Sequence, residues 1–123
     1  MVVVDTSVWI RFLAGKEPYA RQLDHLLAHD EVLGHDLVYG ELLMGERGGR
    51  AKLLAAYAEM FRAQSVSHQE VVDLVKSRKL NGRGLGWVDA HLLASTLVAR
   101  SKLWTADVAL MGAAENLGIQ HEA

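Results

Sequence analysis

Four acidic residues could lie at one edge of a predicted sheet: Asp5, Glu41, Asp89 and Asp107. Asp5 and Asp107 follow predicted strands, and Glu41 and Asp89 lie on predicted helices. Crossover connections in a parallel sheet bring the ends of distant strands together at that edge. Two like charges about 4 Å apart repel by on the order of 4 kcal/mol at an effective dielectric of about 20. Carboxylates that meet there therefore need a hard cation, and Mg²⁺ or Mn²⁺, which prefer oxygen ligands, would support phosphoryl chemistry.

Each of these acids also has a purely structural interpretation. Asp5 can cap the helix that follows it, although the two hydroxyl residues after it could do the same. Asp89 can be a first-turn partner of a helix dipole, and Asp107 can be an N-cap. Glu41 can be an ordinary surface residue of a helix. The residue types alone leave these alternatives open.

Length and composition limit the class of protein. The chain has 123 residues, half of them hydrophobic, which predicts a single domain over residues 1–123 with a real core. The absence of cysteine excludes disulfides, zinc–thiolate sites and cysteine nucleophiles. No basic segment followed by an apolar one opens the chain, and no apolar run approaches the roughly 20 residues of a membrane span. We therefore expect a cytoplasmic protein with no membrane partner.

Charge is distributed unevenly along the chain. Residues 1–46 carry a net charge of −5, residues 47–83 carry +5, and residues 84–123 carry −2. This pattern favours a cluster of metal-binding carboxylates beside a rim that attracts phosphate, although solvated helix faces give the same pattern. The basic segment supplies the candidate phosphate contacts: Arg47, Arg50, Lys52, Lys76, Arg78, Lys79 and Arg83.

Short apolar runs alternate with helical patterns. We expect strands at 2–4, 32–35, 64–66 and 102–105, with a further edge strand at 119–121. Helices are expected at 7–14, from Pro18 onward, at 37–44, around 53–61, after Ser67, from about 88, and at 108–117. This alternation predicts an α/β fold with a mostly parallel sheet that is covered on both faces.

The histidines and tryptophans offer weaker signals. Trp9 and Trp104 are expected in the core, and Trp87 follows a glycine-rich loop, where core packing and base stacking are both open. Four histidines lack the spacing of metal ligands, and we expect them to be structural or on the surface: His35, His68, His91 and His121.

Four short blocks resemble the acidic blocks of the PIN-domain ribonucleases, and most closely those of the VapC toxins of bacterial toxin–antitoxin modules. They are VVDTSVWI at 3–10, ELLMG at 41–45, WVDAHLLA at 87–94 and LWTAD at 103–107. Each block alone is a weak pattern, but all four in order make a specific match that covers essentially the whole chain. The resemblance implies a PIN-like three-layer α/β/α fold with four to five strands and about seven helices.

The resemblance also implies a function. It indicates a type II toxin: an endoribonuclease that uses Mg²⁺ or Mn²⁺ to cut RNA, often a tRNA or rRNA. By position, the catalytic and metal-binding residues would be Asp5, Glu41, Asp89 and Asp107, which we call the four acids. Thr6 and Thr105 would be supporting hydroxyls. Many relatives carry a further acid where this chain has Ala109, which argues against a fully occupied second metal site.

Partners follow from the same resemblance. It implies a homodimer that assembles with a cognate VapB-type antitoxin into a larger complex, with a basic antitoxin side chain near the acids. Leucines of the second to fourth helices are candidates for the apolar part of that contact: Leu23, Leu27, Leu42 and Leu43.

Three other classes compete with this interpretation. A PIN-fold module that binds RNA or protein without catalysis would not need all four acids. A haloacid-dehalogenase-like phosphatase has an Asp after its first strand but needs a second acid two residues later, where this chain has Ser7. A response-regulator receiver needs its phosphorylated Asp at the end of a middle strand. RNA cleavage by the purified protein would distinguish the enzyme from the binding module.

Overall fold

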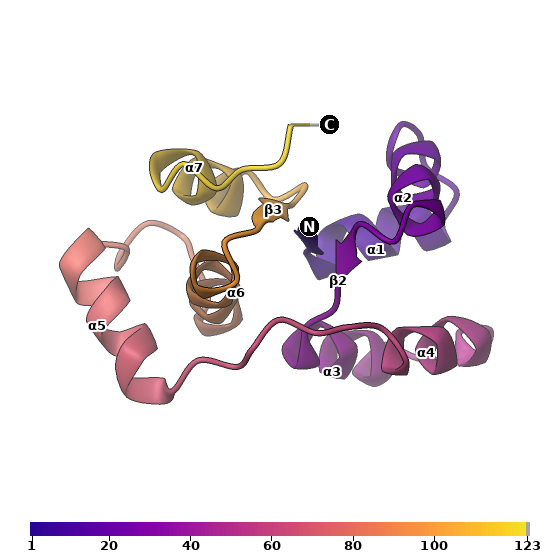
Figure 1. Ribbon diagram of the computed structural model, residues 1–123, viewed down its shortest axis with the longest axis horizontal. Coiled ribbons are helices and arrows are strands. Elements are labelled where there is room, and N and C mark those ends of the chain that lie inside the picture. Colours follow the sequence, from indigo (N-terminus) through magenta and orange to yellow (C-terminus); the bar gives the residue numbers. More distant parts are fainter. Residues whose placement is uncertain (123) are drawn as a thin grey trace.

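A computed structural model describes residues 1–122, which form seven helices around a three-stranded parallel sheet (Figure 1). The strands are β1 (Val2–Val4), β2 (Val32–Leu33) and β3 (Lys102–Trp104). The helices are α1 (Thr6–Leu13), α2 (Tyr19–Ala28), α3 (Asp36–Met44), α4 (Ala51–Ala58), α5 (His68–Arg78), α6 (Trp87–Val98) and α7 (Val108–Asn116). The predicted α/β class, parallel sheet and helix number are confirmed.

The sheet has the order β2-β1-β3, with Val3 of β1 paired in parallel to Leu33 on one side and Leu103 on the other. All three residues of β1 are buried. Such an unbroken apolar run is typical of a parallel strand that is covered on both faces. β1 is therefore the central strand, and the residue after it lies at the middle of the sheet edge.

The sheet has fewer strands than the predicted four to five. The segment 64–66 is not a strand, because the chain meets the edge of β2 at a single bridge between Gly34 and Arg62 before turning away. Gln120 likewise forms only one bridge, with Leu103. The predicted fourth helix is also too long, since α4 ends at Ala58 and Phe61 beyond it is 85% exposed.

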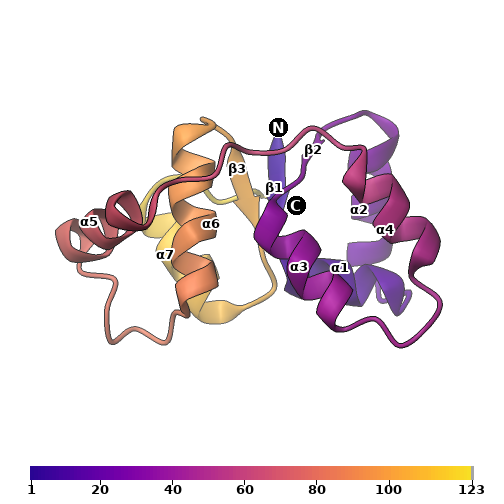
Figure 2. The same ribbon diagram turned by 90° about the horizontal axis from the view of Figure 1, so that it is seen from below.

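Helices cover both faces of this short sheet. In Figure 1, α7 and α6 lie on opposite sides of β3, with α2 on the side of α7 and α3 on the side of α6. Figure 2, seen from below, places the strands between a group formed by α5, α6 and α7 and a group formed by α1 to α4. None of the helices within residues 1–122 has the length and apolar character that a membrane span requires.

The core confirms two of the three tryptophan predictions. Trp9 is 1% exposed and packs edge-on against Phe12 and Tyr57, while Trp104 is 4% exposed. Trp87 is 45% exposed, so of the two alternatives for this residue core packing is wrong. It begins α6, where its ring contacts His68 and His91 instead of the core.

The start of α3 depends on a buried histidine. His35 is 1% exposed, and its Nδ1 accepts a hydrogen bond of 3.0 Å from the Leu37 amide, so the ring and not Asp36 caps the helix. Its Nε2 lies 2.9 Å from Ser95 Oγ of α6, and the Tyr57 hydroxyl accepts a bond of 2.8 Å from the His35 amide. Because Nδ1 is an acceptor, the ring must be neutral with its proton on Nε2. The prediction that His35 is structural is confirmed.

This arrangement makes stability depend on pH. Burial lowers the pKa of His35 below its ordinary value of 6.5, an effect that Asp36 opposes and His91 reinforces. The unfolded chain therefore binds this proton more readily, and the free energy of unfolding should decline as the pH falls below about 6.5 and through the lower pKa of the folded state. His35→Asn keeps a capping group without titrating. Its Tm should therefore fall less between about pH 8 and pH 5 than that of the unaltered protein.

His29→Asn is the matched control, because His29 is exposed at the C-cap of α2. Equal slopes of Tm against pH for the unaltered protein and His35→Asn would contradict a neutral capping role for His35.

Candidate active site

The carboxylate of Asp5 is held by two hydroxyl groups at the end of the central strand. Asp5 is 7% exposed, and its Oδ2 accepts hydrogen bonds of 2.6 Å from Ser7 Oγ and 2.8 Å from Thr105 Oγ1. Although Asp5 occupies the N-cap position of α1, its side chain makes no capping hydrogen bond. The capping alternative is therefore wrong for this carboxylate, which is oriented by groups that follow both β1 and β3.

The same two hydroxyls fix the segment that leads to Asp107. Ser7 Oγ accepts a bond of 3.0 Å from the Ala106 amide, and Thr105 Oγ1 accepts one of 3.0 Å from the Asp107 amide. Each hydroxyl donates to Asp5 and accepts from the backbone before α7. The network thus couples the position of Asp107 to that of Asp5, and it includes Ser7, which was not among the predicted site residues.

Glu41 lies on α3, which places it next to the start of α1. Its Oε1 accepts a hydrogen bond of 2.6 Å from Thr6 Oγ1, the first residue of α1. Thr6 and Thr105 therefore each contact one acid, in line with the predicted supporting hydroxyls. Glu41 itself is exposed, and its place depends on the docking of α3, which His35 caps.

Asp107 has the N-cap role considered above, and Asp89 lies in the first turn of α6, as its dipole alternative requires. Asp89 Oδ2 accepts a bond of 2.9 Å from the Gly86 amide before α6, and Asp107 Oδ1 accepts one of 3.0 Å from the Leu110 amide in α7. In each case only one carboxylate oxygen is used. The same holds for all four acids: within residues 1–122 each has one oxygen bonded to the protein and a second without a hydrogen-bond partner.

The pKa of Asp89 is influenced by the charges of the other three acids. The pKa of Asp89 is raised first by burial and then by the charges of Asp5, Asp107 and Glu41, while the Gly86 amide opposes the shift. The one ion pair in the described part of the chain joins Arg62 to Asp36, so no basic side chain there neutralises the four acids. Within that part, no three acidic or histidine side chains are close enough to enclose an ion as they stand. The charges of the other three acids therefore act on Asp89 without the side chains forming a closed cage in the described part of the chain.

Comparison with known proteins identifies the family. The model of the PIN domain matches residues 2–115. The chain belongs to the PIN-domain family. It is 42% identical over 120 residues to Ribonuclease VapC32 from two strains of Mycobacterium tuberculosis, an alignment that covers 97% of this chain and 94% of the relative. The predicted resemblance to the VapC-type members is confirmed.

A solved structure supports the fold. The crystal structure of PAE2754 from Pyrobaculum aerophilum aligns with a TM-score of 0.58 and 19% identity, covering 90% of this chain and 82% of that one. At this identity the likeness concerns the PIN fold alone.

Removing one negative charge from this PIN domain should stabilise it in the absence of metal. Because the raised pKa of Asp89 means that the folded state holds its proton more tightly, stability is lost as the pH rises through that pKa. Asp89→Asn keeps an oxygen for the Gly86 amide and removes the repulsion. In metal-free buffer at neutral pH we expect its Tm to rise by on the order of a few degrees.

The matched control is Asp24→Asn, which neutralises an exposed acid of α2. An equal rise in both variants, or a fall in Asp89→Asn alone, would contradict mutual repulsion among the four acids.

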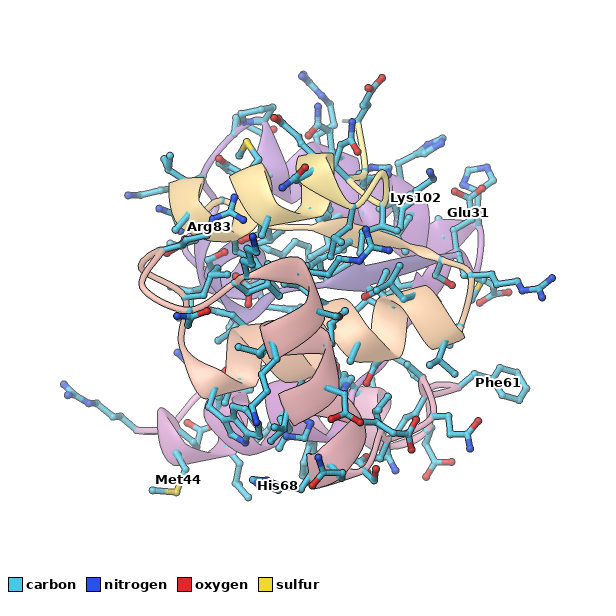
Figure 3. All side chains as sticks on the ribbon, turned by 90° about the vertical axis from the view of Figure 1, so that its left-hand side faces the viewer. Glu31, Met44, Phe61, His68, Arg83 and Lys102 are labelled. Atoms are coloured by element: carbon cyan, nitrogen blue, oxygen red, sulfur yellow. The ribbon has the colours of Figure 1, made fainter. Side chains whose placement is uncertain are left out.

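The basic candidates differ in how free their side chains are. Arg50 is partly occupied, because its Nη1 donates to the Leu42 carbonyl at 3.0 Å and ties α4 to α3. Arg83 is exposed in the glycine loop and lies beside α7 in Figure 3. A Cβ built at Gly84 of that loop would lie 3.6 Å from Ala109 Cβ, so the loop borders the start of α7. The other predicted phosphate contacts are also exposed: Arg47, Lys52, Lys76, Arg78 and Lys79.

The leucines proposed for a protein contact divide into two groups. Leu23 and Leu42 are 0% exposed and belong to the core, so they are wrong as surface candidates. Leu27 is partly buried against that core, while Leu43 is 49% exposed. Helical spacing alone did not distinguish the buried from the exposed members.

Arg11 lies next to the candidate site, a position that the sequence did not reveal. Its Nη1 donates to the Ser7 carbonyl at 2.9 Å, and its guanidinium lies 5.6 Å from the centre of the Tyr19 ring. It is half-buried on α1, one turn after Ser7. A cation thus stands close to the residues that orient Asp5 without pairing with any of the four acids.

Proposed function

We propose that this protein is the toxin of a type II toxin–antitoxin system and acts as an endoribonuclease that requires Mg²⁺ or Mn²⁺. The observation that carries the proposal is the arrangement of the four acids, each with one oxygen fixed by the protein and one left for a ligand. The VapC-type relative at 42% identity, which is named a ribonuclease, supports the same activity.

The donor set fits a hard divalent ion. The four acids offer only carboxylate oxygens, and a cation would offset the charges of Asp5, Asp107 and Glu41, which together with burial raise the pKa of Asp89. Mg²⁺ usually keeps several waters and binds through one or two carboxylates directly. It therefore does not require the acids to form a closed cage. A bound ion would supply an activated water and would stabilise charge on the leaving oxygen.

The protein's own groups would orient the reaction. Ser7 and Thr105 hold Asp5 so that its Oδ1 points away from their hydrogen bonds, and Thr6 does the same for Glu41 Oε2. Asp89 Oδ1, on a carboxyl with a raised pKa, is suited to take a proton from an attacking water. The RNA phosphate would be positioned by the basic residues around the site.

The exposed basic residues at the end of α5 and in the glycine loop are expected to supply RNA affinity. Reversal of Arg78, Lys79 and Arg83 to Glu should weaken binding to single-stranded RNA and reduce the slope of log K against log salt by about 0.7 for each phosphate that the protein no longer neutralises. Filter binding over a range of salt concentrations measures both quantities. The control reverses three other exposed residues, Lys16, Arg21 and Arg100; equal weakening in the two triple variants would mean that the effect is only one of net charge.

An antitoxin would silence the enzyme by occupying the acid site. An Arg placed among the four acids gains charge-assisted hydrogen bonds and excludes metal or phosphate. A hollow of about 570 Å³ beside Thr6 and Glu41 is lined by apolar Leu37, Met44 and Val88, and Met44 is 87% exposed. This surface, with Leu43, would receive the apolar part of a VapB-type antitoxin. We also propose that the toxin is a homodimer and assembles with its antitoxin into a larger complex.

The activity is tested by incubating cellular RNA with the purified protein. New RNA ends should appear at a small set of sites, in tRNA or rRNA, when Mg²⁺ or Mn²⁺ is present, and should vanish when a chelator is added. RNA that stays intact under all metal conditions would contradict the enzyme and favour the PIN-fold binding module without catalysis.

A further inference from the structure

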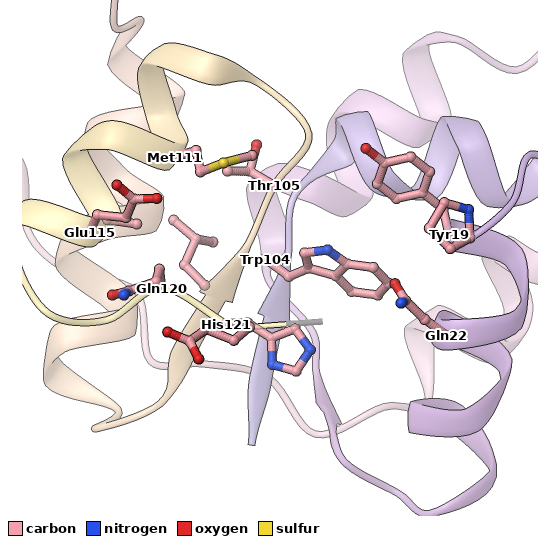
Figure 4. A pocket seen from close by; sticks show the side chains of 12 residues that line it. Tyr19, Gln22, Trp104, Thr105, Met111, Glu115, Gln120 and His121 are labelled. Atoms are coloured by element: carbon pink, nitrogen blue, oxygen red, sulfur yellow. The ribbon is translucent and has the colours of Figure 1, made fainter.

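A cavity of about 310 Å³ lies on the face of the sheet that α2 and α7 cover (Figure 4). Its walls include Tyr19 and Gln22 from α2, Trp104 from β3, and Met111 and Glu115 from α7. The segment that pairs with β3 through Leu103 closes the cavity below with His121. The volume is at the lower end of the roughly 300–1,000 Å³ typical of ligand pockets.

The indole of Trp104 forms part of the cavity wall. Trp104 as a whole is 4% exposed and lines the cavity. Its indole N–H differs from that of Trp9, which is buried and has no partner within residues 1–122, because the indole N–H of Trp104 is not fully enclosed. Figure 4 shows its indole reaching across between Tyr19 and His121. An indole N–H is a hydrogen-bond donor at the edge of an apolar ring, so a flat ligand that carries an acceptor can bond to it from within the cavity.

The lining favours a flat neutral ring over a phosphate. Trp104 stacks against Tyr19 at 6.1 Å and 24° and is tilted against His121 at 5.4 Å. The polar groups are side-chain amides, the Thr105 hydroxyl, the carboxylates of Glu115 and Glu122, and the His121 ring. Neither Lys nor Arg lines the cavity within residues 1–122. Burial lowers the pKa of His121, which keeps this ring neutral near neutral pH. Aromatic walls with hydrogen-bond donors and acceptors suit the flat face and the polar edge of a nucleobase.

The cavity adjoins the four acids through three shared contacts. Thr105 lines it and also donates to Asp5. Met111 stands one turn after Asp107 on α7, where its amide bonds to the Asp107 carbonyl at 2.9 Å. Arg11 joins the two regions, since it donates to Ser7 and lies over Tyr19. A strand with its scissile phosphate at the acids therefore has a neighbouring base within reach of the cavity, with Arg11 between them to meet the backbone.

We propose that this cavity is a base-binding subsite that takes one unstacked nucleobase of the RNA, with guanine as the best match. Guanine presents carbonyl and ring-nitrogen acceptors to the Trp104 N–H and an amino donor to the Glu115 carboxylate. The proposal rests on the proposed ribonuclease function for its biological meaning. Binding of the base itself does not need activity or metal.

The first test is a binding measurement on the metal-free protein. Titration with guanosine monophosphate should shift one indole N–H resonance in the ¹H–¹⁵N spectrum, the one that is missing from Trp104→Phe. Uridine monophosphate at the same concentration should shift it less. An indole signal of Trp104 that does not move with either nucleotide would overturn the subsite, as would a shift seen only with an antitoxin peptide.

The second test reads specificity during cleavage. With a pool of randomised RNA and Mn²⁺, sequencing of the new ends should show a guanine preference at one position near the cut. Trp104→Phe and the surface variant Glu115→Gln should each reduce that preference by roughly fivefold or more, while Asp24→Asn should retain it. An unchanged guanine preference in both variants would overturn the subsite. Absence of any cleavage would contradict the ribonuclease function, and the nucleotide titration would then be the test of base binding in the cavity.

Discussion

Replacing Asp5 with Asn is expected to reduce RNA cleavage by more than about a hundredfold while leaving the fold intact. Loss of groups that merely orient metal ligands costs roughly 10–100-fold, so loss of the central carboxylate charge should cost more. Asn is nearly isosteric, and its carbonyl oxygen can still accept from Ser7 and Thr105, which hold Oδ2 in the native protein. Cleavage rates on a mapped RNA site, with circular dichroism as a check on folding, measure the effect.

Growth on expression gives a second readout of the same variant. Cells that express Asp5→Asn should grow normally, and cells that express Asp24→Asn should arrest unless an antitoxin is present. Antitoxin affinity should fall only modestly in Asp5→Asn, because most of the contact would be apolar. Growth arrest by Asp5→Asn would mean that Asp5 is not the central ligand.

The second large effect is expected at Thr105. Thr105→Val keeps the shape of the side chain but removes a hydroxyl that donates to Asp5 and accepts from the Asp107 amide. We expect a loss of roughly 10–100-fold in kcat and in Mn²⁺ affinity, with little change in KM for RNA. Because Thr105→Ser retains the hydroxyl, it should recover most of the activity.

A merely structural role for Thr105 would give a different pattern. In that case Thr105→Val would lower Tm without a change in Mn²⁺ affinity, and Thr105→Ser, which removes a buried methyl group, would be no better than Val. Such a result would contradict the positioning of Asp5 by this hydroxyl.

Local sequence was sufficient for those elements that local physics determines. The three valines of β1 could be read as a buried parallel strand because β-branched residues without polar alternation fit a sheet that is covered on both faces. Ser67 could be read as the cap of α5, and its hydroxyl does accept from the Glu70 amide at 3.2 Å. The segment 64–66 failed because extended backbone becomes a strand only when a partner runs beside it, and here only Gly34 and Arg62 meet.

The candidate site also contains residues that local sequence indicates and residues whose roles depend on distant parts of the chain. The four acids could be named as candidates from the sequence because each lies in a short recognisable block. Ser7 could not, since its role depends on Thr105 and Ala106, nearly a hundred residues later in the chain. The contact of Arg11 with Tyr19 was likewise not predictable, because it depends on how the turn before α2 places the Tyr19 ring beside the guanidinium. Solvent exposure could not be predicted from residue type either, because Trp87 is of a type common in cores and yet lies on the surface.

Calorimetric titration of the purified protein with Mn²⁺ tests the central claim, a metal site at the four acids, most directly. We expect the unaltered protein to bind Mn²⁺, Asp5→Asn and Asp89→Asn to bind it more weakly, and Asp24→Asn to bind it as the unaltered protein does. Mn²⁺ affinity that is the same in all four proteins would contradict the site.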